Sequence, residues 1–136
     1  MIPNLKGVYS ILCNKENINF LDESLGGHFK GKNPTVDKNV LKNNWVDGAG
    51  ILYIGKAGGA KSSSTLKRRI WQYMQFGCGK PVGHWGGRLI WQIKENKELL
   101  LAYKTLDKIE PRIYEKELIG DFIRKFGILP FANLVH

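Results

Sequence analysis

A single carboxylate, Glu115, falls among apolar residues in the last helix that the sequence predicts. With about 100° of rotation per residue, one face of this helix is an apolar stripe formed by Ile119, Phe122, Ile123 and Phe126. Glu115 lies four residues before Ile119 and projects from the stripe, whereas Glu117 lies on nearly the opposite side. A carboxylate that faces a sheet costs several kcal/mol unless it is paired, hydrogen-bonded or bound to a cation. Glu115 therefore forms a structural ion pair, lies at a solvent-exposed edge of the stripe, or binds a metal.

Arg69 holds a similar position on an earlier helix. The apolar face of that helix consists of Leu66, Ile70, Tyr73 and Met74. Arg69 borders this face, four residues before Tyr73, while Arg68 points away toward solvent or phosphate. A flanking arginine is commonly a solvated residue. Because two helices each direct one charged group at the same sheet, however, we interpret the pair as a site that can hold a divalent cation and a phosphate together.

The other apolar segments predict the strands that support these helices. Gly7–Leu12 alternates and is rich in β-branched and aromatic residues, which is typical of a strand. Residues 51–54 predict a second strand, which Gly55 ends. Two later apolar runs, at 89–93 and 99–103, are interpreted as a strand pair, with a buried helical turn as the alternative for the first run.

Capping residues set the limits of the two helices. The serines at 62–64 can cap a helix that begins near Thr65. A proline at a favoured start position and Gly127 as terminator predict a last helix over Pro111–Phe126. The resulting order of strand, strand, helix, strand or strands, and helix predicts a mixed α+β fold.

Length and charge restrict the function further. The chain has 136 residues, 43% of them hydrophobic, which fits one domain with a buried core and excludes wholesale disorder. Its 21 Lys and Arg against 12 Asp and Glu leave a net charge of +9, so we expect polyanionic partners, above all nucleic acid. No apolar stretch approaches the roughly 20 residues of a membrane span. Cys13 and Cys78 are far apart in the sequence, which favours reduced thiols and a cytoplasmic location.

Five ordered motifs resemble the signature of the GIY-YIG nuclease family. They are GVY at 7–9, YIGK at 53–56, LKRRIWQY at 66–73, EKELI at 115–119 and PFAN at 130–133. The first two resemble the halves that give the family its name. The third resembles a helix in which a catalytic Arg precedes a Tyr or His by four positions, and the fourth resembles the metal-binding helix. The match spans nearly the whole chain.

This resemblance implies a small nuclease domain with a short, mainly antiparallel sheet of about three strands between helices. It implies hydrolysis of DNA phosphodiester bonds with one divalent cation, Mg²⁺ or Mn²⁺. The residues that it selects as catalytic are Tyr9, Tyr53, Lys56, Arg69, Tyr73, Glu115 and Asn133. Glu115 would anchor the metal, and Arg69 would neutralise charge on the phosphate in the transition state. Tyr9 or Tyr53 would activate the attacking water, with a pKa lowered by cations such as Lys56.

The chain departs from the family pattern in two ways. Tyr9 and Tyr53 are 44 positions apart instead of being joined by a short hairpin turn. The stretch at about 14–48 is therefore an irregular surface insertion, with a short helix near 37–43, that serves as a target-reading element, a lid or an oligomerisation arm. No separate DNA-binding domain follows Asn133, so we expect specificity to come from the insertion, from a homodimer or from another subunit. The candidate DNA contacts are Lys61, Ser63, Arg68, His84 and Arg88.

Three other interpretations have less support. Residues 55–62 resemble a P-loop except at its second glycine, and no later strand ends in the Asp that would hold Mg²⁺. No paired zinc-ligand spacing joins Cys13, His28, Cys78 and His84. Trp71 lies off the apolar face of its helix, where it either packs against the insertion or stacks on a base. The principal alternative to a nuclease is a non-catalytic nucleic-acid-binding module that uses the same basic surface.

Overall fold

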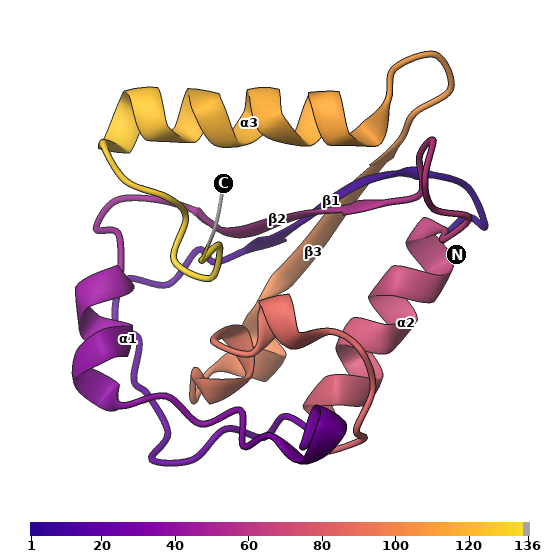
Figure 1. Ribbon diagram of the computed structural model, residues 1–136. Helices are drawn as coiled ribbons and strands as arrows, with labels where there is room; N and C mark the ends of the chain where they lie inside the picture. The colour runs from indigo at the N-terminus through magenta and orange to yellow at the C-terminus, as the bar shows by residue number, and fades with distance from the viewer. Residues whose placement is uncertain (135–136) are drawn as a thin grey trace.

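The structure, a computed structural model, describes residues 1–134 and has the mixed α+β fold that the sequence predicts. The strands and α-helices follow one another as β1 (Gly7–Leu12), α1 (Lys38–Asn44), β2 (Ile51–Ala57), α2 (Leu66–Gly77), β3 (Leu100–Thr105) and α3 (Pro111–Phe126) (Figure 1). Short 3-10 turns occur at Phe29–Gly31, Trp85–Gly87, Ile90–Gln92 and Asn96–Glu98. Among residues 1–134, no helix combines the length and the apolar character that crossing a membrane requires.

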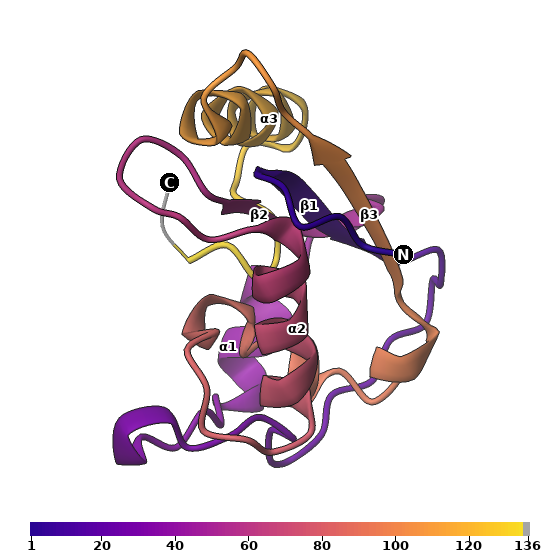
Figure 2. The same ribbon diagram turned by 90° about the vertical axis from the view of Figure 1, so that its right-hand side faces the viewer.

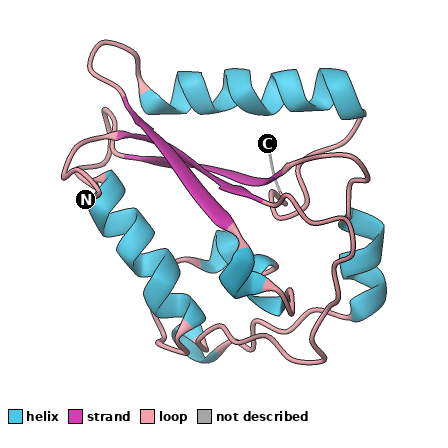
Figure 3. Cartoon of the chain, turned by 180° about the vertical axis from the view of Figure 1, so that it is seen from behind, coloured by secondary structure: helices cyan, strands magenta, loops and turns pink. Residues whose placement is uncertain are grey.

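β1 is the central strand of an antiparallel sheet whose strand order is β2-β1-β3. Tyr9 of β1 is opposite Gly55 of β2 on one side and Tyr103 of β3 on the other. Both outer strands are therefore edges of the sheet. Figure 3 shows the three strands crossing the middle of the molecule between the helices, which confirms the expected short antiparallel sheet.

Helices cover both faces of this sheet. α3 lies along one face, and α2 lies on the opposite side together with α1 (Figure 1, Figure 2). Side chains alternate accordingly: Tyr9 and Ile11 belong to the core shared with α2, whereas Ile54 lies beside Phe122 of α3. Each large apolar side chain that is fully removed from water stabilises this arrangement by about 1.5–3 kcal/mol.

Local capping explains where the helices begin and end. Thr65, rather than a preceding serine, caps α2, because its Oγ1 accepts a hydrogen bond from the N–H of Arg68 at 3.2 Å. Asp37 caps α1 in the same way. Pro111 begins α3 and Gly127, with a φ of 79°, ends it, as predicted.

Two predictions about the strands are wrong. β2 continues through Gly55 to Ala57, because Gly55 is paired within the ladder. Residues 89–93 form no strand, since the chain makes a 3-10 turn at Ile90–Gln92 and β3 pairs with β1 instead. A continuous apolar run fits either a strand or a buried turn, and Ile90 is fully buried here.

The insertion between β1 and β2 is more than a surface feature, which corrects the prediction for 14–48. The rings of Phe20 and Trp45 pack on Phe131, with ring centroids 5.7 and 5.2 Å apart. The buried side chain of Gln92 donates a hydrogen bond to the carbonyl oxygen of Val36 at 2.7 Å and accepts one from its N–H at 2.9 Å. These contacts make the insertion part of the core.

The register of β1 and β2 places the ring of Tyr9 over Gly55. A Cβ at position 55 would lie 2.6 Å from Cζ of Tyr9 and 2.8 Å from its hydroxyl oxygen. We expect Gly55→Ala to lower the free energy of unfolding by about 1–3 kcal/mol, as overpacking does, and urea denaturation measures this change. In Gly50→Ala, the control, the new Cβ would meet only the carbonyl oxygen of Cys13, at 3.7 Å. An equal loss in both variants would contradict this explanation.

Candidate active site

A cleft of about 490 Å³ opens beside β2, at the edge of the sheet. Residues of β2, of the loop that follows it, of α2 and of α3 line it: Tyr53, Lys56, Ala57, Gly58, Ser62, Ser64, Arg68, Arg69, Gln72 and Glu115. α2 and α3 lie on opposite faces of the sheet (Figure 2). Side chains from opposite faces can meet only around an edge strand, so the position of β2 lets both helices contribute to a single cleft.

The acid and the guanidinium selected by helical periodicity both lie in this cleft. Glu115 on α3 and Arg69 on α2 are half-buried, whereas Glu117 is exposed. Nη1 of Arg69 donates hydrogen bonds to Oε1 of Gln72 at 2.7 Å and to the carbonyl oxygen of Gly83 at 2.9 Å. These bonds fix a positive charge at the cleft.

Tyr9 and Tyr53 face the same side of the sheet on adjacent strands, with ring centroids 6.0 Å apart. Tyr53 lines the cleft, whereas Tyr9 lies behind it and is almost completely buried. Burial raises the pKa of Tyr53; the Arg69 guanidinium opposes this shift and the Glu115 carboxylate adds to it. Burial also raises the pKa of Tyr9 well above its usual value. The expectation that cations lower these pKa values is therefore wrong for the protein alone, because loss of water contact outweighs the charge of Arg69.

His84 contributes to the site in a way that the sequence analysis missed. Its side chain is fully buried, so the prediction that it contacts DNA is wrong. Nε2 of His84 lies 2.6 Å from the hydroxyl oxygen of Tyr9, and the ring centroid lies 6.0 Å from that of Tyr53 and 5.3 Å from that of Tyr73. Burial, with the charge of Arg69, lowers the pKa of His84 to about 3. The imidazole is therefore neutral at pH 7.

The glycines beside His84 are the sequence signal of this close packing. A Cβ at Gly86 would lie 3.1 Å from the hydroxyl oxygen of Tyr53, and a Cβ at Gly87 would lie 2.8 Å from Nδ1 of His84. Only a loop without side chains at these positions can bring the imidazole against the tyrosines. The unusual run GHWGGR at 83–88 thus reflects packing behind the cleft.

Tyr73 and Asn133, both selected by the family motifs, do not line the cleft. Tyr73 is buried between the rings of His84 and Trp91, and burial raises its pKa. The side chain of Asn133 accepts a hydrogen bond from the N–H of Ile54 and donates one to its carbonyl oxygen, both at 2.9 Å. Both residues hold neighbours of the cleft in place. The motif-selected residues that line the cleft itself are Tyr53, Lys56, Arg69 and Glu115.

The remaining candidates for DNA contact differ in their surroundings. Lys61, Ser63 and Arg68 are exposed, and Arg68 also lines the cleft. Arg88 turns back on its own loop: Nη1 donates to the carbonyl oxygen of Trp85 at 3.2 Å, and the guanidinium lies 4.9 Å from the centre of the Trp85 ring. Of these candidates, Arg68 is the one that lines the cleft, and Arg88 does not.

The loop after β2 does not form a phosphate cradle. Oε1 of Glu110 accepts a hydrogen bond from the backbone N–H of Ala60 at 3.0 Å. A carboxylate in this position repels phosphate. The structure thus disfavours the P-loop interpretation of residues 55–62.

Within the cleft, Glu115 is the residue that could hold a hard divalent cation. Glu115 is the acidic side chain among the described residues that line the cleft, and residues 1–134 contain no group of three or more His, Cys, Asp or Glu side chains placed to share a metal. Mg²⁺ commonly takes one or two carboxylates and keeps several water molecules, with substrate phosphate as a further ligand. One carboxylate at the wall of an open cleft meets that requirement.

Comparisons of the chain with models of known protein families, with curated proteins and with solved structures find no match.

Burial of neutral His84 makes stability depend on pH. The group titrates near 6.5 when unfolded and near 3 when folded, so between these values the unfolded chain binds one more proton and acid destabilises the fold. From pH 7 to pH 5 the loss is about 2 kcal/mol. We expect urea denaturation of His84→Gln to show a pH dependence smaller by that amount, whereas His28→Gln at an exposed position keeps it. Protonation of the wild-type His84 ring above pH 5 in an NMR titration would contradict this prediction.

Proposed function

We propose that this protein is a metal-dependent DNA endonuclease of the GIY-YIG type, which hydrolyses phosphodiester bonds. The observation that carries the proposal is that Glu115, Arg69 and Tyr53 share one cleft although they come from three elements far apart in the sequence. Helical periodicity selects two of them and the family motifs select all three. The net charge of +9 supports a polyanionic substrate.

Arg69 is suited to bind the scissile phosphate. Its planar fork matches two phosphate oxygens. Because Gln72 and Gly83 already hold the guanidinium, it loses little rotamer freedom when the substrate binds. Arg68 and Lys56, which line the same cleft, add positive charge for the flanking backbone.

Tyr53, rather than Tyr9, is the group proposed to accept the proton of the attacking water. Tyr53 lines the cleft, whereas the hydroxyl of Tyr9 is hydrogen-bonded to His84 behind it. When Nε2 of His84 carries the ring proton, it donates to the hydroxyl oxygen of Tyr9. The hydroxyl proton of Tyr9 can then donate to a phenolate at Tyr53. His84 and Tyr9 are then positioning residues. In its phenolate form Tyr53 takes a proton from the attacking water while the water oxygen forms a bond to phosphorus. The P–O bond to the leaving strand breaks, and the leaving oxygen takes a proton from bulk water.

Glu115 is proposed to hold Mg²⁺ or Mn²⁺. When bound, the cation supplies positive charge that stabilises the phosphate in the transition state and offsets the effect of Glu115 on the pKa of Tyr53. Arg69 contributes a second positive charge from the protein itself. Together these charges match what a reacting phosphodiester requires.

Cleavage of supercoiled plasmid with Mg²⁺ or Mn²⁺ tests the proposal. Glu115→Gln and Arg69→Ala should each lower the cleavage rate at least about 100-fold, since each removes charge stabilisation of the transition state. The controls Glu117→Gln and Lys67→Ala change exposed residues of the same two helices and should cut like wild type. If all five proteins cut equally, the proposal fails. Steeply salt-dependent binding without cutting of any DNA form would favour the non-catalytic module.

A second prediction separates the two tyrosines. Tyr53→Phe should lower the cleavage rate by about 100-fold or more, as loss of a general base does, and Tyr9→Phe by about tenfold or less. Because burial raises the pKa of Tyr53, the wild-type rate should increase with pH between about 7 and 9, and this increase should disappear in Tyr53→Phe. If Tyr9→Phe alone removes the pH dependence, Tyr9 is the base.

A further inference from the structure

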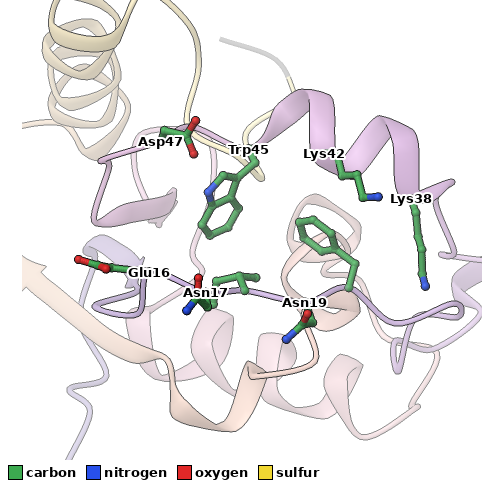
Figure 4. Close-up of a pocket in the computed structure, with 9 residues that line it drawn as sticks. Glu16, Asn17, Asn19, Lys38, Lys42, Trp45 and Asp47 are labelled. Carbon is green, nitrogen blue, oxygen red and sulfur yellow. The ribbon is translucent and has the colours of Figure 1, made fainter.

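A second hollow, of about 640 Å³, lies in the insertion and shares no lining residue with the cleft beside β2. It is lined by Glu16, Asn17, Ile18, Asn19, Phe20, Lys38, Lys42, Trp45 and Asp47 (Figure 4). We name it the insertion pocket. Its lining combines aromatic rings, amides and charges of both signs, which the nuclease chemistry proposed above does not use.

The aromatic wall of the insertion pocket is held rigidly from behind. The half-buried ring of Trp45 meets Phe131 edge to face, with centroids 5.2 Å apart, and lies 6.1 Å from the ring of Phe20. Phe20 in turn stacks on Phe131 at 5.7 Å. An indole fixed in this way can pack against a flat ligand with little further loss of conformational freedom.

The polar groups of the insertion pocket are separated by charge. Figure 4 shows Glu16 and Asp47 on one side of Trp45, with Lys42 and Lys38 on the other side along α1. Lys38 forms an ion pair with Asp22 at 2.6 Å, but both side chains are exposed, so this pair is weak and can be shared with an anion. A ligand that fits this pocket has a flat ring between a hydrogen-bond-donating edge and an anionic group.

We propose that the insertion pocket binds a nucleotide, with the base against Trp45, the phosphate at Lys38 and Lys42, and the amino edge of the base at Asp47, which lies on the same side as Glu16. Stacking on an aromatic side chain and a lysine on the backbone are the usual means of holding an unpaired nucleotide. The carboxylates add selectivity. Cytosine, adenine and guanine carry amino groups that donate to a carboxylate. Thymine has no amino group, and its one donor, N3–H, lies between two carbonyl oxygens that a carboxylate repels.

The source of the nucleotide is a base that is unpaired in a DNA strand, which gives the insertion a role in target recognition. This step rests on the proposed nuclease function, whereas nucleotide binding itself does not. The pocket is also fastened to the cleft: Phe131 contacts Trp45, and Asn133, two residues later, holds Ile54 next to Tyr53. A strand anchored in the pocket is thereby held at a fixed position relative to β2.

Binding without catalysis tests the proposal. The Glu115→Gln protein, in EDTA, is titrated into labelled duplexes that are fully paired or carry one unpaired cytosine or thymine. We expect the unpaired cytosine to bind about tenfold tighter than either other duplex. Trp45→Ala should abolish this preference, and Asp47→Asn should reduce it to about twofold or less. Trp71→Ala, which removes an exposed tryptophan of α2, should leave it unchanged.

Titration with free dCMP identifies the source of the ligand, because tight, Trp45-dependent binding of dCMP would show that a strand is not required. Equal affinities for all three duplexes and no binding of dCMP would overturn the proposal, as would a preference lost in Trp71→Ala instead of Trp45→Ala. If Trp45→Ala does not fold, Asp47→Asn, at an exposed position, decides. Because no cleavage is measured, this result is independent of whether the wild-type protein cuts DNA.

Discussion

The arrangement of the site depends on β2 remaining the edge strand of the sheet. An edge strand presents backbone N–H and C=O groups that pair with another chain unless they are satisfied. Asn133 satisfies both groups of Ile54 through its side-chain amide. Together with the N–H of Ala132, which donates to the carbonyl oxygen of Leu52 at 2.8 Å, Asn133 covers this part of the outer side of β2 without adding a fourth strand. The space beside the rest of the strand stays open as a cleft. A further strand in that place would separate Glu115 on one face of the sheet from Arg69 on the other.

The charge of Arg69 affects titratable groups both in the cleft and behind it. Its charge opposes the raised pKa of Tyr53 and contributes to the lowered pKa of His84. Burial acts in the same direction as the guanidinium on the imidazole but against it on the phenol. At neutral pH the imidazole of His84 and the phenols of Tyr9 and Tyr73 behind the cleft are therefore uncharged, next to the fixed positive charge of Arg69 at its wall. With Lys56, Arg68 and Arg69 against the carboxylate of Glu115, the lining of the cleft carries an excess of positive charge, which favours an anion.

The sequence predicts most of the helices and the inward position of the acid, because both depend on local periodicity. The limits of α3 follow from a proline and a glycine at its ends, and the placement of Glu115 follows from its spacing to Ile119. One assignment on α2 is wrong: Met74 is half exposed while Phe76 is fully buried, because Phe76 packs against Trp85 and against Gly26 of the insertion. His84 could not be placed from the sequence, since its burial is decided by long-range contact with Tyr9. The contacts of Gln92 with the insertion could not be predicted either, because they also join residues far apart in the sequence.

The long connection between β1 and β2 is compatible with an intact sheet because closing a longer loop costs little. Each doubling of loop length adds only about 0.6 kcal/mol of entropy cost, which is less than burial of one large apolar side chain provides. The insertion buries Leu41, which is fully inaccessible to solvent, and Val46. This apolar burial more than offsets the entropy cost of closing the insertion, which packs as part of the core. The same packing fixes Trp45 at the surface, so the stability of the insertion and its capacity to hold a flat ligand have one physical origin.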